Sequence, residues 1–333
     1  MNHPASANFD LIACEICGQD RFAILCDWNH LSQVMQCVNC GLQFVNPMPN
    51  REYLNQLYQQ DGEDHAYYTN YIQERKDRWP SYRKQYNRRL DLIEKYCGKK
   101  GRLLDIGCGG GFFMQAALER GWEPHGIDIV PGFISFARDE LRLRHVHSTA
   151  FEETPFPERH FDVVVLWDLI EHLRRPRAYL EKINRVLRPG GLLIIWTPNA
   201  ANAAWLKEKW FGYTPLQHLY FFSTPTLKAI LQATGFRMAY KNTNRAKKGF
   251  FFHPSNAPYR KPNPAQGGLK KLLMGIKRDL KNFVNPVNYI SPLLDWAGYG
   301  FNLYVIGQKC SDLTPRDGRD AHASAIASSP SGQ

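Results

Sequence analysis

A run of glycines beside two carboxylates is the part of the sequence best suited to bind a small ligand. Asp105 precedes a loop that contains Gly107 and Gly109, and Asp128 follows about 20 residues later. Glycine permits backbone angles and a close approach to a ligand that a Cβ atom would block. A carboxylate at this interval can accept hydrogen bonds from both hydroxyls of an adenosine ribose. These residues therefore predict a nucleoside site, with Ile129 packed on the adenine.

The spacing of the glycines excludes two common nucleotide-binding motifs. The dinucleotide pattern Gly-x-Gly-x-x-Gly would need glycine where Phe112 stands, and no Gly-Lys-Ser or Gly-Lys-Thr sequence is present. We therefore expect a ligand whose main-chain-like portion is uncharged or zwitterionic, rather than a pyrophosphate.

Two Cys-x-x-Cys pairs near the start of the chain are suited to bind a metal ion. Cys14 and Cys17 form the first pair, and Cys37 and Cys40 form the second after nineteen intervening residues. Two such knuckles present four thiolates tetrahedrally, which suits Zn²⁺ and leaves no ligand position for water. The spacing predicts a structural zinc site, and the alternatives are ordinary buried cysteines or a redox pair.

Short apolar runs alternate with helical patterns between residues 101 and 200. The apolar runs are Arg102–Gly107, His125–Ile129, Asp162–Asp168 and Leu192–Thr197, and the helical patterns are Phe112–Arg120, Pro131–Glu140 and Ala178–Leu187. This alternation predicts βαβ units and a mostly parallel sheet. The glycine loop and both carboxylates then lie where strands end and helices begin.

At this point the sequence resembles class I S-adenosylmethionine-dependent methyltransferases. The resemblance rests on residues 105–111, on Asp128, on Phe-Asp-Val-Val-Val at 161–165 and on Arg-Val-Leu-Arg-Pro-Gly-Gly at 185–191. It covers roughly residues 100–245, with a last strand at 301–309. It implies an α/β fold with a Rossmann-like seven-stranded sheet whose last strand is antiparallel.

The resemblance also implies which residues bind the cofactor, S-adenosylmethionine. Asp105 and the loop would hold the methionine part, Asp128 the ribose, and Phe151 and Glu152 would lie near the adenine. The implied cofactor-binding residues are Asp105, Ile106, Gly107, Cys108, Gly109, Asp128, Ile129, Phe151, Glu152 and Asp168. The family often has an Asp near position 150, where this chain has Ala150.

Three further motifs are similar to those of a bacterial subgroup of these methyltransferases. They are Cys37-Val-Asn-Cys-Gly-Leu-Gln-Phe-Val-Asn-Pro, Trp167-Asp-Leu-Ile-Glu-His-Leu and Gln217-His-Leu-Tyr-Phe-Phe-Ser. Members of the subgroup carry an N-terminal zinc knuckle and are often linked to polysaccharide or lipid-linked glycan biosynthesis. The resemblance implies a sugar or lipid-linked acceptor, and the basic charge of the chain favours an anionic small-molecule, sugar or lipid-linked one.

Two histidines are candidates for the catalytic general base. Methyl transfer from a sulfonium is an in-line displacement, and a hydroxyl nucleophile benefits from a base that titrates near neutral pH. His172 follows a predicted strand and His218 lies in an aromatic loop, and the alternative for each is a purely positional role. Asp168, Glu171 and His172 are also similar to a Glu-x-x-Glu-His cluster that binds a divalent metal in ubiquinone-pathway O-methyltransferases. The alternatives there are cofactor contact and loop positioning.

The charge of the chain is basic and is concentrated in two windows. The formal net charge is +11; residues 75–102 hold eleven Lys or Arg against three acids, and residues 237–281 hold twelve against one. Such windows are either solvated helix faces or a basic surface near a substrate entrance. The first ten residues contain no apolar signal region, and no run of 18 apolar residues occurs. We therefore expect a cytoplasmic protein without a membrane-spanning helix.

Residues 269–283 are predicted to form a basic amphipathic helix. Apolar residues recur there at helical spacing, and lysines and arginines fill the flanks. Its apolar face either packs on the catalytic domain or lies on the anionic inner face of the membrane.

The sequence predicts four segments and one leading function. The segments are a zinc-ribbon-like domain at 1–60, a helical cap or linker at 61–98, a methyltransferase domain at 99–310 and a disordered tail at 311–333. The leading function is methyl transfer to a sugar or lipid-linked glycan precursor. The alternatives are an RNA or quinone-type O-methyltransferase, and a non-enzymatic zinc protein that binds nucleic acid.

Overall fold

The computed structural model describes residues 8–29, 32–54, 56, 65–206, 210, 212–214, 217–244, 293, 295–310 and 312. The predicted basic helix at 269–283 lies outside the described residues, as does the predicted tail at 311–333 apart from Asp312. Within the described part of the chain, no helix is long and apolar enough to cross a membrane.

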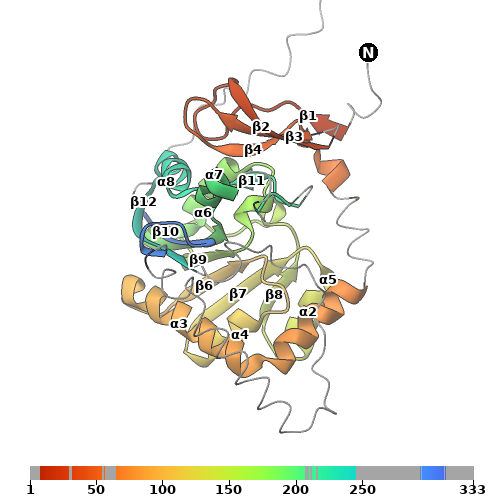
Figure 1. Cartoon of the computed structure of the whole chain (residues 1–333). Coiled ribbons are helices and arrows are strands. Elements are labelled where there is room, and N and C mark those ends of the chain that lie inside the picture. Colours follow the sequence, from red (N-terminus) through yellow and green to blue (C-terminus); the bar gives the residue numbers. More distant parts are fainter. Residues whose placement is uncertain are drawn as a thin grey trace, which may run out of the picture.

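A seven-stranded sheet forms the centre of the molecule (Figure 1). Its strand order is β12-β13-β10-β9-β6-β7-β8. The strands are β6 Arg102–Ile106, β7 Glu123–Asp128, β8 His145–Ser148, β9 Phe161–Trp167, β10 Leu187–Pro198, β12 Phe236–Asn244 and β13 Asn302–Lys309. The five strands from β10 to β8 are parallel, and β13 runs antiparallel to both of its neighbours. The predicted fold, including its antiparallel last strand, is confirmed.

Helices cover both faces of this sheet, as Figure 1 shows. They are α2 His65–Asp77, α3 Trp79–Cys97, α4 Phe112–Glu119, α5 Pro131–Asp139, α6 Pro176–Val186, α7 Ala203–Leu206 and α8 Thr224–Ala233. Successive side chains of a strand point to opposite faces. Accordingly Leu103 packs with residues of α3 and α4, whereas Leu104 packs with residues of α6 and α8. The central strands are therefore apolar throughout, because both of their faces are buried.

The N-terminal part of the chain forms a small sheet that is completed by one strand from the second half of the chain. Its strands β2 Phe22–Asn29, β3 Ser32–Cys37 and β4 Gln43–Asn46 are joined by β11 Tyr220–Phe221 in the order β11-β4-β3-β2. The short strands β1 Phe9–Asp10 and β5 Met48–Pro49 pair with each other. Phe44 of β4 and Tyr220 of β11 lie in the same buried cluster as Leu104 of the large sheet. We call residues 8–54 the N-terminal module, and it shares both a sheet and a core with the rest of the protein.

A buried lysine joins the last strand to the end of α6. Lys309 is 4% exposed and donates hydrogen bonds to the carbonyl oxygens of Asn184 and Leu187, at 2.7 and 2.9 Å. These carbonyls belong to the C-terminal end of α6, where helical partners are absent. Replacing Lys309 by methionine is expected to lower the free energy of unfolding by about 3 kcal/mol, because two buried carbonyls lose a charged donor. Denaturant unfolding measures this, with the exposed Lys241→Met as control; equal midpoints would contradict the assignment.

Candidate active site

A cavity of about 690 Å³ lies where the carboxyl ends of β6, β7, β9 and β10 meet α2 and α3. One part of its lining comes from the strand ends and the loops after them: Asp105, Gly107, Cys108, Gly109, Asp128, Trp167, Asp168 and Trp196. The other part comes from helices: Asn70, Tyr71, Glu74, Arg75, Tyr82, Gln85, Tyr86, Arg89, Phe113 and Phe133. Ligands of open α/β sheets bind at this edge.

The glycine loop is bent by positive backbone angles and held by β7. Gly107 and Gly109 have φ values of +74° and +52°, which residues other than glycine rarely adopt. The amide of Gly107 donates to the carbonyl of Ile127 at 2.8 Å. A Cβ atom at Gly109 would lie 2.6 Å from the hydroxyl oxygen of Tyr71. Glycine at this position therefore keeps the space between the loop and α2 open.

Asp128 fixes the loop and still presents lone pairs to the cavity. Its two carboxylate oxygens accept hydrogen bonds from the amides of Gly109 and Val130, each at 2.9 Å. Burial raises the pKa of Asp128, while these backbone amides act in the opposite direction. Each carboxylate oxygen can accept a second hydrogen bond. The geometry suits an acceptor for a pair of ligand hydroxyls, as the sequence predicts.

Asp105 presents to the cavity a buried carboxylate oxygen that lacks a hydrogen-bond partner in the described part of the chain. It is 1% exposed, and its Oδ1 has no hydrogen-bond partner among the described residues. Burial, together with the nearby charge of Asp128, raises the pKa of Asp105 to about 8, although Arg89 opposes the shift. A carboxylate in such a site is stabilised by a cationic ligand group. The α-ammonium group of S-adenosylmethionine fits this requirement, and Asp128 suits its ribose.

The other predicted cofactor residues are divided by the structure. Cys108 and Asp168 line the cavity with Asp105, Gly107, Gly109 and Asp128. Ile106, Ile129, Phe151 and Glu152 do not line it. Phe151 lies in the core against Tyr179, with ring centroids 4.8 Å apart, whereas Ile129 is 55% exposed beside Asp128. The packing of Ile129 on the adenine stays a prediction, and direct contact by Phe151 would require its side chain to leave the core.

The aromatic and basic wall on α2 and α3 was not among the predicted site residues. Arg75 lies over the ring of Tyr71 at 3.3 Å, and Arg89 lies over Trp167 and Trp196 at 4.3 and 4.6 Å. Spacings of three and four residues place Tyr82, Gln85, Tyr86 and Arg89 on one face of α3. That periodicity is visible in the sequence and is the feature that indicates a shared helix face.

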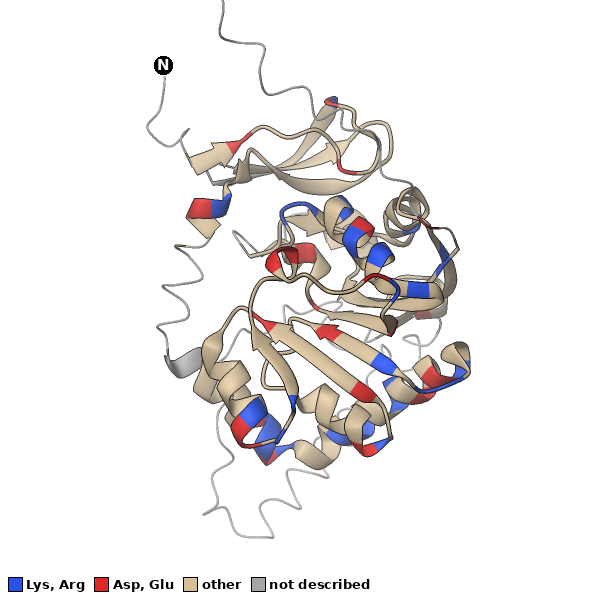
Figure 2. Ribbon diagram, turned by 180° about the vertical axis from the view of Figure 1, so that it is seen from behind, with Lys and Arg blue, Asp and Glu red and all other residues tan. Residues whose placement is uncertain are grey.

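The arginines of the basic window at 75–102 therefore fall into two groups. Arg75 and Arg89 line the cavity. Arg78 and Arg83 do not line it: Arg78 pairs with Glu74 at the rim at 3.0 Å, and Arg83 pairs with Glu119 at 2.7 Å. Figure 2 shows basic and acidic residues interspersed along these helices rather than separated. The outer face is a solvated helix face, and the basic character that matters for a ligand points inward.

The two predicted catalytic histidines lie together, away from the lining of the cavity. Their rings meet edge to face with centroids 4.8 Å apart. Nδ1 of His172 donates to the carbonyl of Gln217 at 2.6 Å, and Nδ1 of His218 donates to the carbonyl of Gly212 at 2.8 Å. Burial lowers the pKa of His172 to about 4 and also lowers that of His218. These shifts favour neutral imidazoles, and an imidazole that donates through Nδ1 carries its lone pair on Nε2. A general-base role remains a prediction.

Glu171 joins this histidine pair, whereas Asp168 does not. Glu171 is 1% exposed; its Oε2 accepts a hydrogen bond from Thr197 at 3.0 Å, and its Oε1 has no partner among the described residues. One ligand atom from each of Glu171, His172 and His218 lies within 4.8 Å of the others. The predicted cluster of Asp168, Glu171 and His172 is thus regrouped, with His218 in place of Asp168. A carboxylate and two imidazoles can bind a divalent ion.

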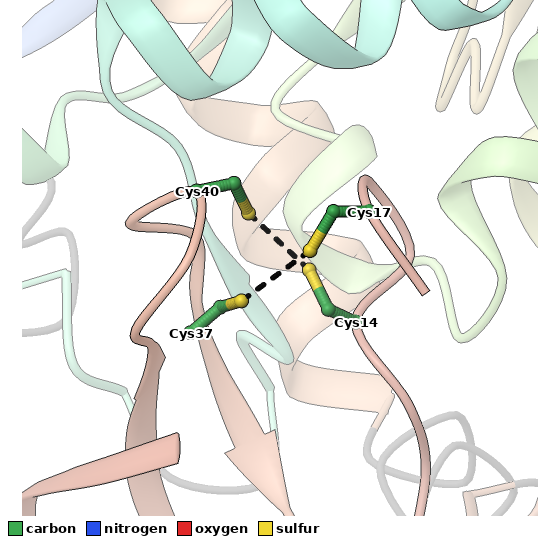
Figure 3. A group of neighbouring side chains, drawn as sticks. All are labelled: Cys14, Cys17, Cys37 and Cys40. Carbon is green, nitrogen blue, oxygen red and sulfur yellow. Dashed lines mark hydrogen bonds between the residues drawn. The ribbon is translucent and has the colours of Figure 1, made fainter. Parts of the chain in front are cut away.

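The four paired cysteines converge on one point of the N-terminal module (Figure 3). The Sγ atoms of Cys14 and Cys40 are 3.4 Å apart and those of Cys17 and Cys37 are 3.5 Å apart, with all four within 4.8 Å of one another. A tetrahedral site with Zn–S bonds of about 2.3 Å needs sulfur separations of about 3.8 Å. Burial raises the pKa of Cys14, and that of Cys40 to about 11, so thiolates there require a bound cation. The donor set fits Zn²⁺.

Comparisons with known proteins agree with this site. Residues 77–241 match the family model of a methyltransferase domain. A ubiquinone biosynthesis O-methyltransferase of Xylella fastidiosa (strain M23) is 33% identical over 128 residues, which are 35% of this chain and 50% of that protein. The protein of the same name from Cereibacter sphaeroides is 38% identical over 103 residues, 29% of this chain and 41% of that protein. The chain thus spans about half the length of the curated relatives it matches, or less.

Solved structures show the same kind of similarity at lower identity. An S-adenosylmethionine-dependent methyltransferase from Archaeoglobus fulgidus has 21% identity and a TM-score of 0.45, over 68% of this chain and 94% of that one. The 1,6-didemethyltoxoflavin-N1-methyltransferase of Burkholderia thailandensis has 14% identity and a TM-score of 0.48, over 87% of this chain and all of that one. The glycine loop and both buried carboxylates lie within residues 77–241, the part of this chain that matches the methyltransferase domain.

Proposed function

We propose that this protein transfers a methyl group from S-adenosylmethionine to a hydroxyl group of an acceptor. The observation that carries the proposal is the buried Asp105 carboxylate, whose Oδ1 lacks a partner beside a glycine loop in a methyltransferase domain. A group of this kind costs stability unless a cationic ligand compensates it. The name of the relatives, O-methyltransferase, supports oxygen as the atom that is methylated.

The described residues would act mainly by binding and orienting the reactants. When bound, S-adenosylmethionine supplies an electrophilic methyl group on a sulfonium. Asp105 would hold the α-ammonium group, and Asp128 the ribose hydroxyls. Trp167 and Trp196, at the ends of β9 and β10, form an aromatic wall between this end of the cavity and α3. Alignment of the nucleophile with the methyl group supplies much of the acceleration of such a displacement.

The acceptor that we propose is an anionic sugar or lipid-linked glycan precursor. Two observations support a ring with a negative substituent. Arg75 and Arg89 provide guanidinium groups suited to a carboxylate or phosphate. Tyr82, Tyr86 and Trp196 provide aromatic faces for a ring. A quinone-type phenol is the second candidate, because the relatives are named for ubiquinone biosynthesis.

The acceptor class can be identified by following a labelled methyl group into the fractions of a bacterial extract. Purified protein is incubated with methyl-labelled S-adenosylmethionine and a fractionated bacterial extract that separates lipid, polysaccharide, RNA, protein and small molecules. We expect label in the polysaccharide or lipid-linked sugar fraction. Label in a phenolic lipid would select the quinone-type candidate, and label in RNA would overturn both. If the protein binds the cofactor but transfers no label to any fraction, the proposed activity is contradicted.

Arg89 and Arg83 provide a matched pair of substitutions for testing whether the α3 side of the cavity binds the acceptor. Both lie on α3, but Arg89 lines the cavity and Arg83 pairs with Glu119 on the surface. Once an acceptor is found, Arg89→Ala is expected to raise its KM by about 10- to 100-fold, since a charged hydrogen bond is lost. Arg83→Ala should leave KM within about 2-fold of wild type, as expected for an exposed ion pair.

We also propose that Cys14, Cys17, Cys37 and Cys40 bind a structural Zn²⁺. The convergence of four Sγ atoms from two tight turns supports this. With four sulfur ligands the coordination shell would be closed, so the metal would stabilise the module and take no part in methyl transfer.

A further inference from the structure

One face of the β7–β8 edge of the large sheet is not covered by a helix in the part of the chain that the structure describes. Val146 of β8 packs in a buried cluster with residues of α4 and α5. The connection from β8 to β9 contains one turn of 3-10 helix, Phe151–Glu153, in place of a longer helix. Figure 2 looks onto the opposite face, where β7 and β8 lie in front. On that face Glu123, His145 and His147 are exposed to solvent and His125 is partly exposed, whereas Ile127 is buried.

Histidines gather on this accessible face. His125 of β7 is the register partner of His145 of β8. Residues two apart on a strand share a face, so Glu123 lies beside His125 and His147 beside His145. His160, which directly precedes β9, has its ring centroid 6.1 Å from that of His125. These four histidines are a large share of the eleven in the chain.

Three of the side chains on this face converge. The imidazole rings of His125 and His145 are stacked, with centroids 4.4 Å apart and planes inclined by 19°. One ligand atom from each of Glu123, His125 and His145 lies within 4.8 Å of the others. The lone pair of an imidazole nitrogen lies in the ring plane, so the exposed ring of His145 would have to turn about its side-chain torsions before both imidazoles could contact one ion beside the carboxylate.

Neighbouring charges orient the group for this role. Nε2 of His125 and Oε1 of Glu123 are 3.2 Å apart, while Nε of Arg102 lies 3.6 Å from Oε2 of the same carboxylate. Arg102 also contacts Nδ1 of His160 at 2.9 Å. Arg102 can hold one carboxylate oxygen while the other faces the two rings, as supporting residues do at metal sites.

We propose that Glu123, His125 and His145 form a binding site for a divalent transition-metal ion of the Zn²⁺ class. Two imidazoles and one carboxylate suit Zn²⁺, Ni²⁺ or Cu²⁺, with water in the remaining positions. The ion would cross-link the edge strand β8 to β7. The site lies at the start of β7, whereas Asp128 and the cavity lie at its end. It is thus separate from the cysteine site and independent of the proposed methyl transfer.

The experiment counts metal ions on the full chain. The zinc content of the purified protein is first measured, and Zn²⁺ is then titrated by calorimetry at pH 7.5. One further equivalent is expected to bind and to raise the melting temperature, because it binds the folded state. His145→Ala should weaken this binding at least 10-fold, whereas His147→Ala, on the same strand and face, should leave it unchanged. Both substitutions are at exposed positions, so folding should be preserved.

Three results would overturn the proposal. The first is the absence of a further equivalent at micromolar Zn²⁺. The second is unaltered binding in His145→Ala, which would locate the ion at Glu171, His172 and His218. The third is equal loss in His147→Ala, which would indicate diffuse surface binding. Methyl transfer should be the same in both variants, so failure of the proposed activity would leave this test intact.

Discussion

Replacing Asp105 by asparagine is expected to weaken the binding of S-adenosylmethionine by about 30- to 100-fold, since a charge-assisted contact in a buried site is lost. The substitution preserves the size of the side chain, so the glycine loop should keep its shape. Isothermal titration at pH 8.5 measures the effect directly. Asp139→Asn on the exposed end of α5 is the control, and its affinity should equal that of wild type. Equal affinity in Asp105→Asn would contradict the role of this carboxylate.

The pH dependence of the two proteins separates this role from simple damage. The pKa of Asp105 in the folded protein is raised to about 8 by burial and by Asp128. A cationic ligand group needs the ionised carboxylate, so wild-type affinity should rise between pH 6 and about pH 8 and then level off. In Asp105→Asn this rise should disappear. A damaged protein would instead bind weakly with an unchanged pH profile.

The free energy of unfolding should change with pH in the direction opposite to that of the ligand affinity. The folded protein retains a proton on Asp105 that the unfolded chain releases near its ordinary pKa of 3.8. The free energy of unfolding therefore falls as the pH rises from about 4 to about 8 on account of this group. Asp105→Asn should remove that part of the pH dependence and raise the melting temperature at pH 8. A substitution that stabilises the fold and weakens the ligand is the pattern expected of a binding residue.

The sequence was sufficient for features that depend on local spacing. The alternation of apolar runs and helices predicted β6, β7, β9 and β10, because buried parallel strands are apolar on both faces. Asp105, Gly107 and Gly109 were identifiable since strand end, glycine turn and helix start follow one another directly. The cysteine pairs were identifiable for the same reason, as each pair spans one tight turn.

Features that depend on contacts between distant segments were not predictable. Arg89 reads as part of a solvated helix face, and only the packing of α3 against the sheet places it over Trp196. The pairing of His172 with His218 depends on the backbone bond from Leu219 to the carbonyl of Glu171. Phe151 was predicted near the adenine from the family resemblance, yet its ring faces into the core. In each case a tertiary contact, rather than a local pattern, fixed the direction of the side chain.

Removing the proposed zinc ion is expected to have the largest effect on stability. Bound zinc contributes several kcal/mol to the folding of small domains, and Cys37→Ser removes one of four ligands from a buried site. For a chain of this length we expect the melting temperature to fall by about 5–10 °C. Treatment of the wild type with a strong chelator should give a similar decrease. Calorimetry or circular dichroism measures both.

Loss of the zinc ion should disturb the N-terminal module and the His172–His218 pair but leave the glycine loop unchanged. β4 pairs with β11, and the amide of Val45 donates to the carbonyl of Leu219 at 2.9 Å, next to His218. Loss of the module therefore releases the segment that holds His218 against His172. Asp105 and Asp128 belong to the large sheet, so the affinity for S-adenosylmethionine should change by less than about 3-fold.

Cys310→Ser, at an exposed position outside the cluster, is the matched control and should leave the melting temperature unchanged. Metal-free wild type with full stability would refute a structural zinc ion, because four thiols packed without a cation would then suffice. If Cys37→Ser instead abolished cofactor binding while leaving the melting temperature intact, the module would be coupled to the cavity and not to the fold. The pairing of β11 with β4, which joins the module to the same core as the large sheet, makes the loss of stability the expected outcome.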